Sequence, residues 1–356
     1  MYLSMLFNKV LIPKNLKKPM AGALFLLFFA GGIYPAHGQS SPVRILFIGN
    51  SFTEGNDLPD IESGLAETAG IKTEIKAYIA LGKSVDYFIH DPACWNFIRS
   101  RPWDYIVIQD DQQYYSGSVG KIDSFGYPSP LLINNIIFQD SIKKLIPCVK
   151  IIYFAGWGKN GGDTSMFPND NTVKLVRRIA DNYLYMNNLP MVHNVIAPIG
   201  IAWISCINQR PHLASNVDTF LYSPDGRHPG KAGSYLAACV IFVTVFHRSP
   251  VGFKDSYRFV SQNLKTFLQQ NAWDAVTGSI KYSNLGGIAP VVRNRGRTMY
   301  ASKKYTSYQW YNNNSPIKGA NLYLYKCPLT GKAQEYRVEA IDKKGCIYRS
   351  FPLRIN

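Results

Sequence analysis

The chain has 356 residues, of which 46% are hydrophobic and 17% are charged, and this composition is typical of a globular protein with one large domain and a smaller part. None of its six cysteines forms a Cys-x-x-Cys pair, which argues against a zinc or redox site. The formal net charge is +16, but no nucleic-acid reader motif accompanies it, so we expect no nucleic acid partner.

The first 38 residues have the order of a secretory signal peptide. Four lysines precede an apolar run over residues 21–30, and the small-residue pattern Ala36-His37-Gly38 follows directly before Gln39. The apolar run is shorter than the roughly 20 residues that cross a bilayer, which favours a cleaved signal over a membrane anchor. We therefore expect a secreted, periplasmic or cell-surface protein that is cleaved near Gly38.

The first predicted strand leads into a serine. The apolar run from Arg44 to Ile48 continues into Gly49-Asn50-Ser51, which is typical of a buried strand that ends in a tight turn. This turn would present the Ser51 hydroxyl at the carboxyl end of the strand, which is the edge where open α/β sheets bind ligands. Ser51 becomes a nucleophile only if a base reaches it.

Strand-like and helical runs alternate along the next two hundred or so residues. The predicted strands are Thr73–Ile79, Tyr105–Ile108, Lys150–Phe154 and Met191–Ala197. The predicted helices are Asp57–Ala69, Leu131–Ile146, Thr172–Asn187, Lys231–Phe246 and Ser256–Gln270. This alternation predicts a three-layer α/β/α sandwich with a parallel sheet.

The character of the chain changes from Leu285. Helical periodicity disappears, and short alternating stretches predict a small all-β module of residues 285–356. Residues 281–356 carry fourteen Lys and Arg against three Asp and Glu, a net charge of +11, so the preceding domain, residues 39–280, is close to neutral. The basic module could engage acidic glycans or cell surfaces; a merely soluble module is the alternative. Cys327 and Cys346 could form a disulfide within it.

Five histidines follow residue 38, and His228 has the most informative surroundings. Asp225 lies three residues before it, in a turn rich in Gly and Pro that leads into the predicted helix Lys231–Phe246. A carboxylate in this position can accept a hydrogen bond from one imidazole nitrogen and leave the other basic toward a hydroxyl. Taken alone, this pattern also fits a helix-capping loop with a solvated Asp and His.

The two ends of the α/β region together carry a family resemblance. Gly49-Asn50-Ser51-Phe52 resembles the Gly-Asp-Ser-Leu block that opens the SGNH (GDSL-type) hydrolases, and Asp225-Gly-Arg-His228-Pro resembles the Asp-x-x-His-Pro block that ends them. The resemblance covers roughly residues 43–248, and it looks closest to an exported bacterial branch. It implies that Ser51 attacks an ester carbonyl, that His228 is the base, and that Asp225 orients His228. Asn50 replaces the usual aspartate, and we expect it to hydrogen-bond around the serine turn.

The same resemblance implies an oxyanion hole, although the middle blocks of the family fit less well. The Ser51 N–H and a glycine after the second strand are the implied backbone donors, and Gly82 is the candidate; an ordinary turn glycine is the alternative. The usual Gly-x-Asn-Asp block is absent. A glutamine amide could replace its asparagine, with Gln109 nearest to the strand end and Gln112 and Gln113 as alternatives.

Three further expectations concern ligands. Trp157 lies on a Gly-rich loop after the fourth strand, where it either stacks on a sugar or packs in the core. No phosphate loop or metal-ligand spacing is present, so we expect neither metal nor cofactor. The tail resembles bacterial Ig-like modules of exported proteins, and Trp310 in one of its strands fits a sandwich core.

We therefore expect a secreted serine esterase, a carboxylic ester hydrolase that works through an acyl-enzyme. Export and the resemblance favour acylated carbohydrate as the substrate, most simply an O-acetyl polysaccharide. Two alternatives stay open: a weak or inactive SGNH-fold protein that binds carbohydrate or a surface, and a hydrolase of lipids or other small esters.

Overall fold

The computed structural model describes residues 41–111, 130–188, 194–214, 221–278, 290–313, 315–328 and 332–355. The predicted signal peptide lies outside these residues. Within them, residues from Ser41 onward belong to one compact unit. None of the helices in these ranges combines the length and the apolar character needed to cross a bilayer.

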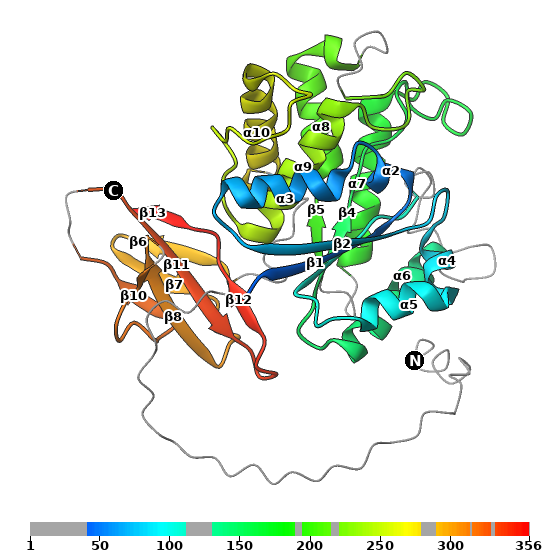
Figure 1. Cartoon of the computed structure of the whole chain (residues 1–356). Helices are drawn as coiled ribbons and strands as arrows, with labels where there is room; N and C mark the ends of the chain where they lie inside the picture. Colours follow the sequence, from blue (N-terminus) through cyan, green and yellow to red (C-terminus); the bar gives the residue numbers. More distant parts are fainter. Residues whose placement is uncertain are drawn as a thin grey trace, which may run out of the picture. The chain divides into compact units, whose positions relative to one another are not determined.

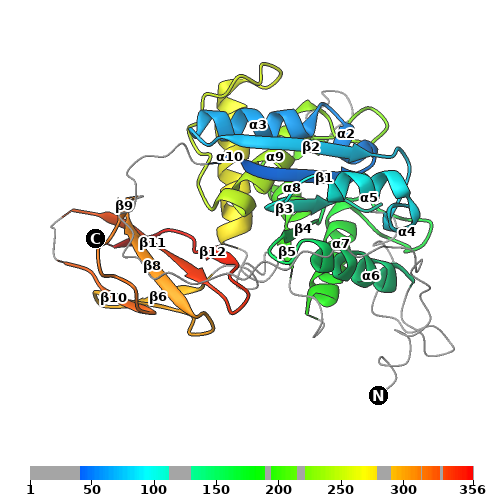
Figure 2. The same ribbon diagram turned by 60° about the horizontal axis from the view of Figure 1, so that its bottom comes forward.

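A five-stranded parallel sheet forms the centre of the α/β part (Figures 1 and 2). The strands follow the order β2-β1-β3-β4-β5, so that the chain leaves β1 toward one edge of the sheet and then continues on its other side. Their bounds are β1 Val43–Gly49, β2 Thr73–Ile79, β3 Tyr105–Ile108, β4 Lys150–Phe154 and β5 Val195–Ala197. Strands β1, β3, β4 and β5 are mostly apolar because helices cover both faces of the sheet, whereas the edge strand β2 also contains Thr73, Glu74 and Lys76.

The helices form the two outer layers, which confirms the predicted α/β/α sandwich. One face of the sheet packs against α3 Leu58–Thr68, α8 Ile199–Gln209, α9 Lys231–Phe246 and α10 Gln262–Thr277. The other face packs against α4 Val85–His90, α5 Pro92–Arg99, α6 Pro130–Leu145 and α7 Thr172–Asn187. Two short helical segments complete this part, α2 Ser51–Glu54 and the 3-10 turn Pro211–Ala214.

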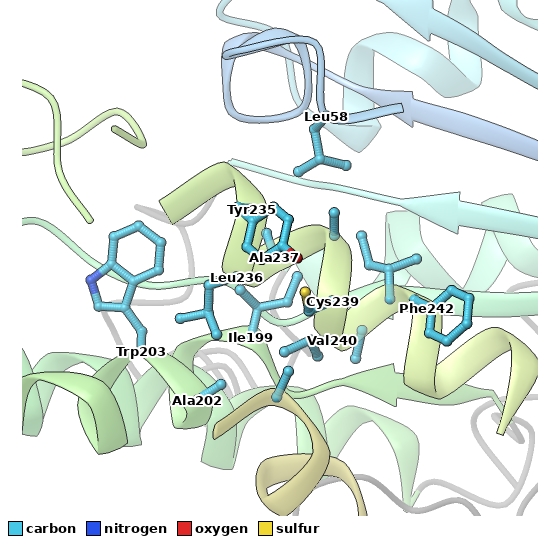
Figure 3. Close-up of a cluster of buried hydrophobic side chains, with 14 of the residues drawn as sticks. Leu58, Ile199, Ala202, Trp203, Tyr235, Leu236, Ala237, Cys239, Val240 and Phe242 are labelled. Atoms are coloured by element: carbon cyan, nitrogen blue, oxygen red, sulfur yellow. The ribbon is translucent and has the colours of Figure 1, made fainter. Parts of the chain in front are cut away.

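The larger hydrophobic core surrounds α9 (Figure 3). All residues from Ala232 to Val245 are buried, because α9 lies between the sheet, α3, α8 and α10. Such a helix has no polar face and therefore reads as a continuous apolar run in the sequence. Burying it on every side fixes the position of its first turn, which directly follows His228 in the sequence.

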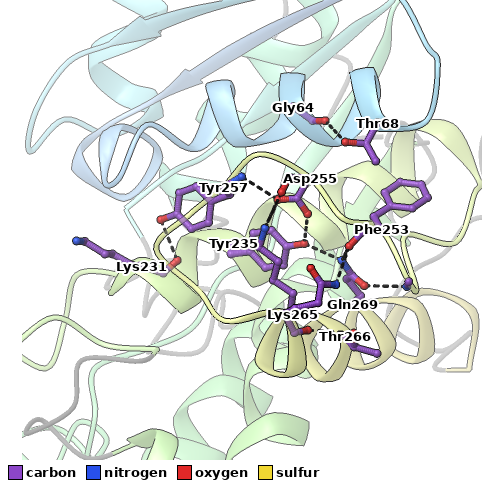
Figure 4. A network of polar contacts seen from close by, with 12 residues as sticks. Gly64, Thr68, Lys231, Tyr235, Phe253, Asp255, Tyr257, Lys265, Thr266 and Gln269 are labelled. Carbon is purple, nitrogen blue, oxygen red and sulfur yellow. Dashed lines mark hydrogen bonds and ion pairs between the residues drawn. The ribbon is translucent and has the colours of Figure 1, made fainter.

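The last helix of the α/β part begins later than predicted. We expected a helix over Ser256–Gln270, whereas α10 spans Gln262–Thr277 with Ser261 as its N-cap. The residues before Ser261 form a loop held by Asp255, which accepts hydrogen bonds from Lys265 Nζ at 2.6 Å and Tyr235 Oη at 2.5 Å (Figure 4). This buried network keeps the loop from continuing the helix, which the local sequence pattern did not reveal.

The C-terminal part consists of two antiparallel sheets, as predicted for an all-β module. The first has the order β10-β7-β6, and the second has the order β12-β11-β8-β9 with β13 added to β11. Trp310 and Tyr336 lie fully buried in the core of the module. The strand bounds are β6 Val292–Arg295, β7 Thr298–Ala301, β8 Ser307–Asn312, β9 Ser315–Pro316, β10 Leu324–Lys326, β11 Gln334–Ile341, β12 Ile347–Arg349 and β13 Leu353–Ile355.

The disulfide differs from the expected one. Cys346 bonds to Cys148, which lies 198 residues earlier in the turn before β4, with 5.1 Å between the two Cα atoms. Cys327 is a buried free thiol. The possible Cys327–Cys346 pair was therefore wrong: a partner in a distant turn cannot be recognised from the spacing of cysteines within the module.

Candidate active site

Ser51 lies at the carboxyl end of β1, between the ends of β2 and β3. The chain passes from β1 to β2 on one side and later returns to β3 on the other side of β1, so the strand order reverses at β1. At such a topological switch point, open α/β sheets form their binding crevice. Gly49 makes the turn possible: a Cβ there would lie 2.4 Å from Thr53 Oγ1 and 2.7 Å from Gln109 Oε1. Ser51 is thus the first residue of α2, with its side chain partly exposed.

Asn50 holds the serine turn in place, as expected. Its side-chain oxygen accepts a hydrogen bond from the Phe52 N–H at 3.1 Å and so caps α2. Its side-chain nitrogen donates to the Lys83 carbonyl at 2.8 Å, which ties the loop after β2 to the loop after β1. Asn50 is almost fully buried, so its role is structural.

The structure brings Ser51, His228 and Asp225 together. Ser51 Oγ lies 2.9 Å from His228 Nε2, and His228 Nδ1 lies 2.5 Å from Asp225 Oδ2. A carboxylate can only accept, so Nδ1 carries the imidazole proton and Nε2 accepts from the Ser51 hydroxyl. Two loops that are 177 residues apart in the sequence therefore form the hydrogen-bond chain of a nucleophile, a base and an orienting acid.

Asp225 keeps its charge although it is partly shielded from water. Burial raises the pKa of its carboxyl, but hydrogen bonds from the His228 side chain and from the N–H groups of Arg227 and His228 outweigh this and lower the pKa below its usual value. The two backbone N–H groups both donate to Oδ1, at 2.9 and 3.0 Å. Oδ2 remains for the imidazole. Because about half of the Asp225 side chain is exposed, its main contribution is orientation.

Aromatic side chains pack against the His228 loop. Trp157 is fully buried, its ring stacks on Trp203 with 4.1 Å between centroids, and its Nε1 donates to the Arg227 carbonyl at 3.0 Å. The Phe52 ring lies 5.2 Å from the His228 ring. Of the two roles expected for Trp157, core packing is therefore right and sugar stacking is wrong, because no face of the ring is open.

A second link between the two catalytic loops was not anticipated. Asn56 Nδ2 donates to the Pro229 carbonyl at 3.1 Å and to Ser234 Oγ at 2.9 Å, and Ser234 Oγ donates to the Gly55 carbonyl at 2.9 Å. These bonds fasten the residues after Ser51 to the residues after His228. The only sequence signal is that Ser234 is a polar residue within the apolar run of α9.

The backbone donors expected for the oxyanion are free. Within the described part of the chain, neither the Ser51 N–H nor the Gly82 N–H makes a hydrogen bond. Gly82 is exposed and has a φ of +65°, a left-handed conformation that favours glycine. Its loop lies beside the serine turn through the bond between Asn50 and Lys83.

Gln109 does not have the role expected for it. Its side chain is fully buried, Oε1 accepts from the Asn50 N–H at 2.8 Å and from Thr53 Oγ1 at 3.1 Å, and Nε2 donates to the Asp110 carbonyl at 2.5 Å. An amide with no exposed surface cannot reach a substrate oxygen, so Gln109 supports the serine turn instead. Gln112 and Gln113 lie outside the described residues.

Among the described residues, no group of three or more His, Cys, Asp or Glu side chains is arranged to hold a metal ion.

Arg227 borders the site: its Nη2 lies 3.6 Å from Asp111 Oδ2, and its guanidinium lies 5.8 Å from the Phe52 ring centroid.

No protein-family model matches the chain, and no curated protein matches its sequence. Among solved structures, a DUF4886 family protein from Bacteroides uniformis is 20% identical and has a TM-score of 0.51, with 66% of this chain and 95% of that chain covered. A lipase/acylhydrolase from Enterococcus faecalis is 16% identical, with a TM-score of 0.37 and 57% and 94% covered. An acetylxylan esterase from Geobacillus stearothermophilus is 13% identical, with a TM-score of 0.39 and 57% and 93% covered. The chain therefore shares an α/β fold with the first of these proteins, and identities this low show the fold alone.

Proposed function

We propose that this protein is a serine hydrolase of acyl esters. The observation that carries the proposal is the hydrogen-bond chain from Ser51 Oγ through His228 to Asp225, at the switch point of a parallel sheet. The free N–H groups of Ser51 and Gly82 support it, because an acyl-transfer site needs donors for the developing oxyanion.

In the proposed reaction, Ser51 Oγ attacks the ester carbonyl while His228 Nε2 takes the serine proton. The Ser51 and Gly82 N–H groups bind the oxyanion of the tetrahedral intermediate. As the intermediate collapses, the imidazolium gives its proton to the leaving alcohol, and the acyl group stays on Ser51. A water molecule then attacks the acyl-enzyme with His228 as its base, which releases the acid and restores the serine. Asp225 keeps the Nδ1 proton in place throughout.

Hydrolysis of p-nitrophenyl acetate tests this activity. We expect Ser51→Ala to lower kcat by at least about a thousandfold, because removing the nucleophile leaves only binding and oxyanion stabilisation. Ser100→Ala, at an exposed serine far along the chain from the site, is the matched control and should behave like wild type. Equal rates for wild type and Ser51→Ala would show that hydrolysis does not depend on Ser51, and would favour the alternative of an inactive protein that binds carbohydrate or a surface.

We further propose export and an O-acetyl carbohydrate as the substrate. The Cys148–Cys346 disulfide supports export, since such bonds persist in oxidising compartments. Amino-terminal sequencing of the protein secreted by its own signal should read from about Gln39. A comparison of acetyl with octanoyl p-nitrophenyl esters separates the two substrate classes: faster hydrolysis of the octanoyl ester would favour the lipid hydrolase.

The β-module, which we propose to be Ig-like, is our candidate for binding acidic glycans. Arg293, Arg295 and Arg297 are all exposed on the hairpin of β6 and β7, which gives the basic charge a defined place. Replacing all three by Ser in the full chain should weaken retention on an acidic polysaccharide such as heparin. The same replacement at Lys72, Lys76 and Arg99, which are exposed in the α/β part, is the control with equal loss of charge. Equal weakening by both sets would mean that only the overall charge matters.

A further inference from the structure

A groove of about 590 Å³ begins at Gly82 and runs along α4 to the start of α5. Figure 1 places α4 and α5 after β2, on the side of the sheet opposite α3. The groove is open to solvent along its length, and its volume falls in the range that small-molecule sites have. Gly82 is the one residue of the acyl-transfer chemistry described above that lines it.

The groove and the candidate active site meet at Gly82. This residue lines the groove and also offers the N–H proposed for the oxyanion. The next residue, Lys83, accepts the hydrogen bond of Asn50 and so lies beside the serine turn. An ester whose carbonyl oxygen points at the Gly82 N–H would therefore have one of its ends in the groove. An acetyl group is far too small to need such a volume, so the end in the groove is the alcohol.

The lining is polar and carries charges of both signs. Lys83, His90, Asp86 and Asp91 all line the groove, and Ser84 Oγ makes no capping bond. A fatty chain in this position would remove charged groups from water without replacing their hydrogen bonds, which is unfavourable. An acidic chain would meet two acidic residues, Asp86 and Asp91, and a single lysine, Lys83. A neutral, polyhydroxylated chain avoids both penalties and can bond to donors and acceptors alike.

Tyr87 adds an aromatic surface to this lining. Its side chain is 39% exposed on the outer face of α4, and Lys83 Nζ lies 5.1 Å from the ring centroid. The charge of the Asp91 carboxylate and a hydrogen bond to it raise the pKa of the Tyr87 phenol, so the hydroxyl end of the side chain is held beside Asp91 and the ring is the part that a ligand can contact. His90 Nδ1 donates to the Asp86 carbonyl at 2.7 Å, which holds the imidazole along α4. Aromatic rings pack on the C–H faces of sugars, while the polar groups bond to sugar hydroxyls.

We propose that this groove binds the alcohol part of the substrate as a neutral oligosaccharide of more than one sugar unit, with Tyr87 as the residue that stacks on it. The proposal rests on the proposed function, since it assigns the leaving group of that reaction.

The test compares Tyr87→Ala with Tyr185→Ala, a tyrosine of similar exposure on α7 outside the groove. We expect Tyr87→Ala to lower kcat/KM for an acetylated xylo-oligosaccharide about tenfold, mainly through KM, which is the loss that one aromatic contact typically causes. Its loss on p-nitrophenyl acetate should be at least fivefold smaller, because that ester has no saccharide. Tyr185→Ala should match wild type on both substrates. Equal losses of Tyr87→Ala on both esters, or no loss on either, would overturn the proposal.

Two further measurements separate this inference from the proposed function. Binding of an unacetylated xylo-oligosaccharide to Ser51→Ala, followed by calorimetry, needs no catalysis, and adding Tyr87→Ala should weaken it about tenfold. If wild type shows no Ser51-dependent hydrolysis but the oligosaccharide still binds in a Tyr87-dependent way, the proposed function would be contradicted and the assignment of the groove would stand. A wild-type preference for an acetylated acidic oligosaccharide over the neutral one would contradict the neutral character assigned here.

Discussion

Asp225 illustrates how single atoms divide the work at this site. Its Oδ1 accepts two backbone N–H groups, and its Oδ2 faces the imidazole of His228. Because the two backbone N–H groups are donors, the atom in the place of Oδ1 must be an oxygen, whatever atom stands in the place of Oδ2. This requirement determines what an amide would do in the same place.

We expect Asp225→Asn to lower kcat on p-nitrophenyl acetate by at least about a hundredfold. The amide oxygen would take the place of Oδ1, and the NH₂ group would face His228 Nδ1 as a donor. The imidazole would then carry its proton on Nε2 and could not accept the Ser51 proton. Asp111→Asn is the control, because Asp111 is a nearby carboxylate that contacts Arg227 and not His228. A loss of activity as large in the control would show that local charge matters rather than the tautomer.

Glu62 is an ionisable residue whose side chain the fold buries without a hydrogen-bond partner for its charged form among the described residues. It lies fully buried on α3, and neither of its carboxylate oxygens has a hydrogen-bond partner within the described part of the chain. Burial raises the pKa of this carboxyl well above its usual value. The unfolded chain therefore loses the Glu62 proton first as the pH rises above about 4.5, and the contribution of this residue to the free energy of unfolding falls from there upward.

We expect Glu62→Gln to be more stable than wild type at pH 8 and to differ less from it at pH 5, as followed by denaturant unfolding. The comparison uses the difference between the two proteins, because buried His247 has a pKa lowered to about 4 by its burial and gives the opposite slope. Glu67→Gln, at an exposed glutamate of the same helix, should show no such difference. A constant gap between Glu62→Gln and wild type from pH 5 to 8 would mean that Glu62 ionises normally.

At the scale of single residues, the roles set by neighbours in the sequence were predicted, and the roles set by packing between distant segments were missed. Ser51, Asp225 and His228 each lie in a short block whose residue types already indicate their role. Gln109 was wrong because the same amide can point outward or back into the serine turn, and only packing decides. The hydrogen bond of Asn50 around the serine turn was predicted correctly because its partner, Phe52, is only two residues away.

The elements follow the same rule. Strands β2, β3 and β4 have the bounds that were predicted, because polar turns delimit each of them: β3 and β4 are short apolar runs, and β2 alternates polar and apolar residues. The start of α10 was wrong because the Asp255 network, which joins residues from α9, α10 and the loop between them, holds the preceding segment as a loop. Sheet order follows from the chain's path across β1, which no local pattern encodes.

The link between α9 and the serine turn has a measurable consequence. Asn56 has a φ of +57°, so Asn56→Gly keeps the backbone unstrained and removes only the bonds to Pro229 and Ser234. We expect kcat to fall about tenfold with little change in KM, because the base would be held less firmly against Ser51. Asn313→Gly, at another left-handed asparagine in the β-module, is the control.

A double-mutant cycle with Ser234→Ala distinguishes this positioning role from a general loss of stability. The effects of Asn56→Gly and Ser234→Ala on kcat should be non-additive, with a coupling of about 0.5–3 kcal/mol, since both remove the same link. Additive effects on kcat would show that the two residues do not act together on the site.

At the scale of the whole molecule, the covalent link lies away from the chemistry. Cys148 precedes β4, so the Cys148–Cys346 disulfide is near the amino ends of the strands, whereas Ser51 follows the carboxyl end of β1. Contacts around it join the β-module to the α/β part: Phe351 stacks on His247 with 4.1 Å between centroids, and Lys150 Nζ lies 5.6 Å from the Tyr348 ring. Stability and catalysis should therefore respond separately to this region.

Replacing both cysteines by serine tests this separation. Closing a loop of 198 residues restricts the unfolded chain, so we expect Cys148→Ser/Cys346→Ser to lose about 2–5 kcal/mol of unfolding free energy and roughly 5–10 °C in Tm. Wild type reduced with dithiothreitol should melt at the same temperature as the double variant. Well below that temperature, kcat/KM for p-nitrophenyl acetate should stay within about twofold of wild type, because the described residues that hold Ser51 and His228 in place, such as Asn50, Asn56 and Trp157, have no bond to the bridge. A large loss of activity in a double variant that is still folded would mean that the β-module acts on the site through the sheet.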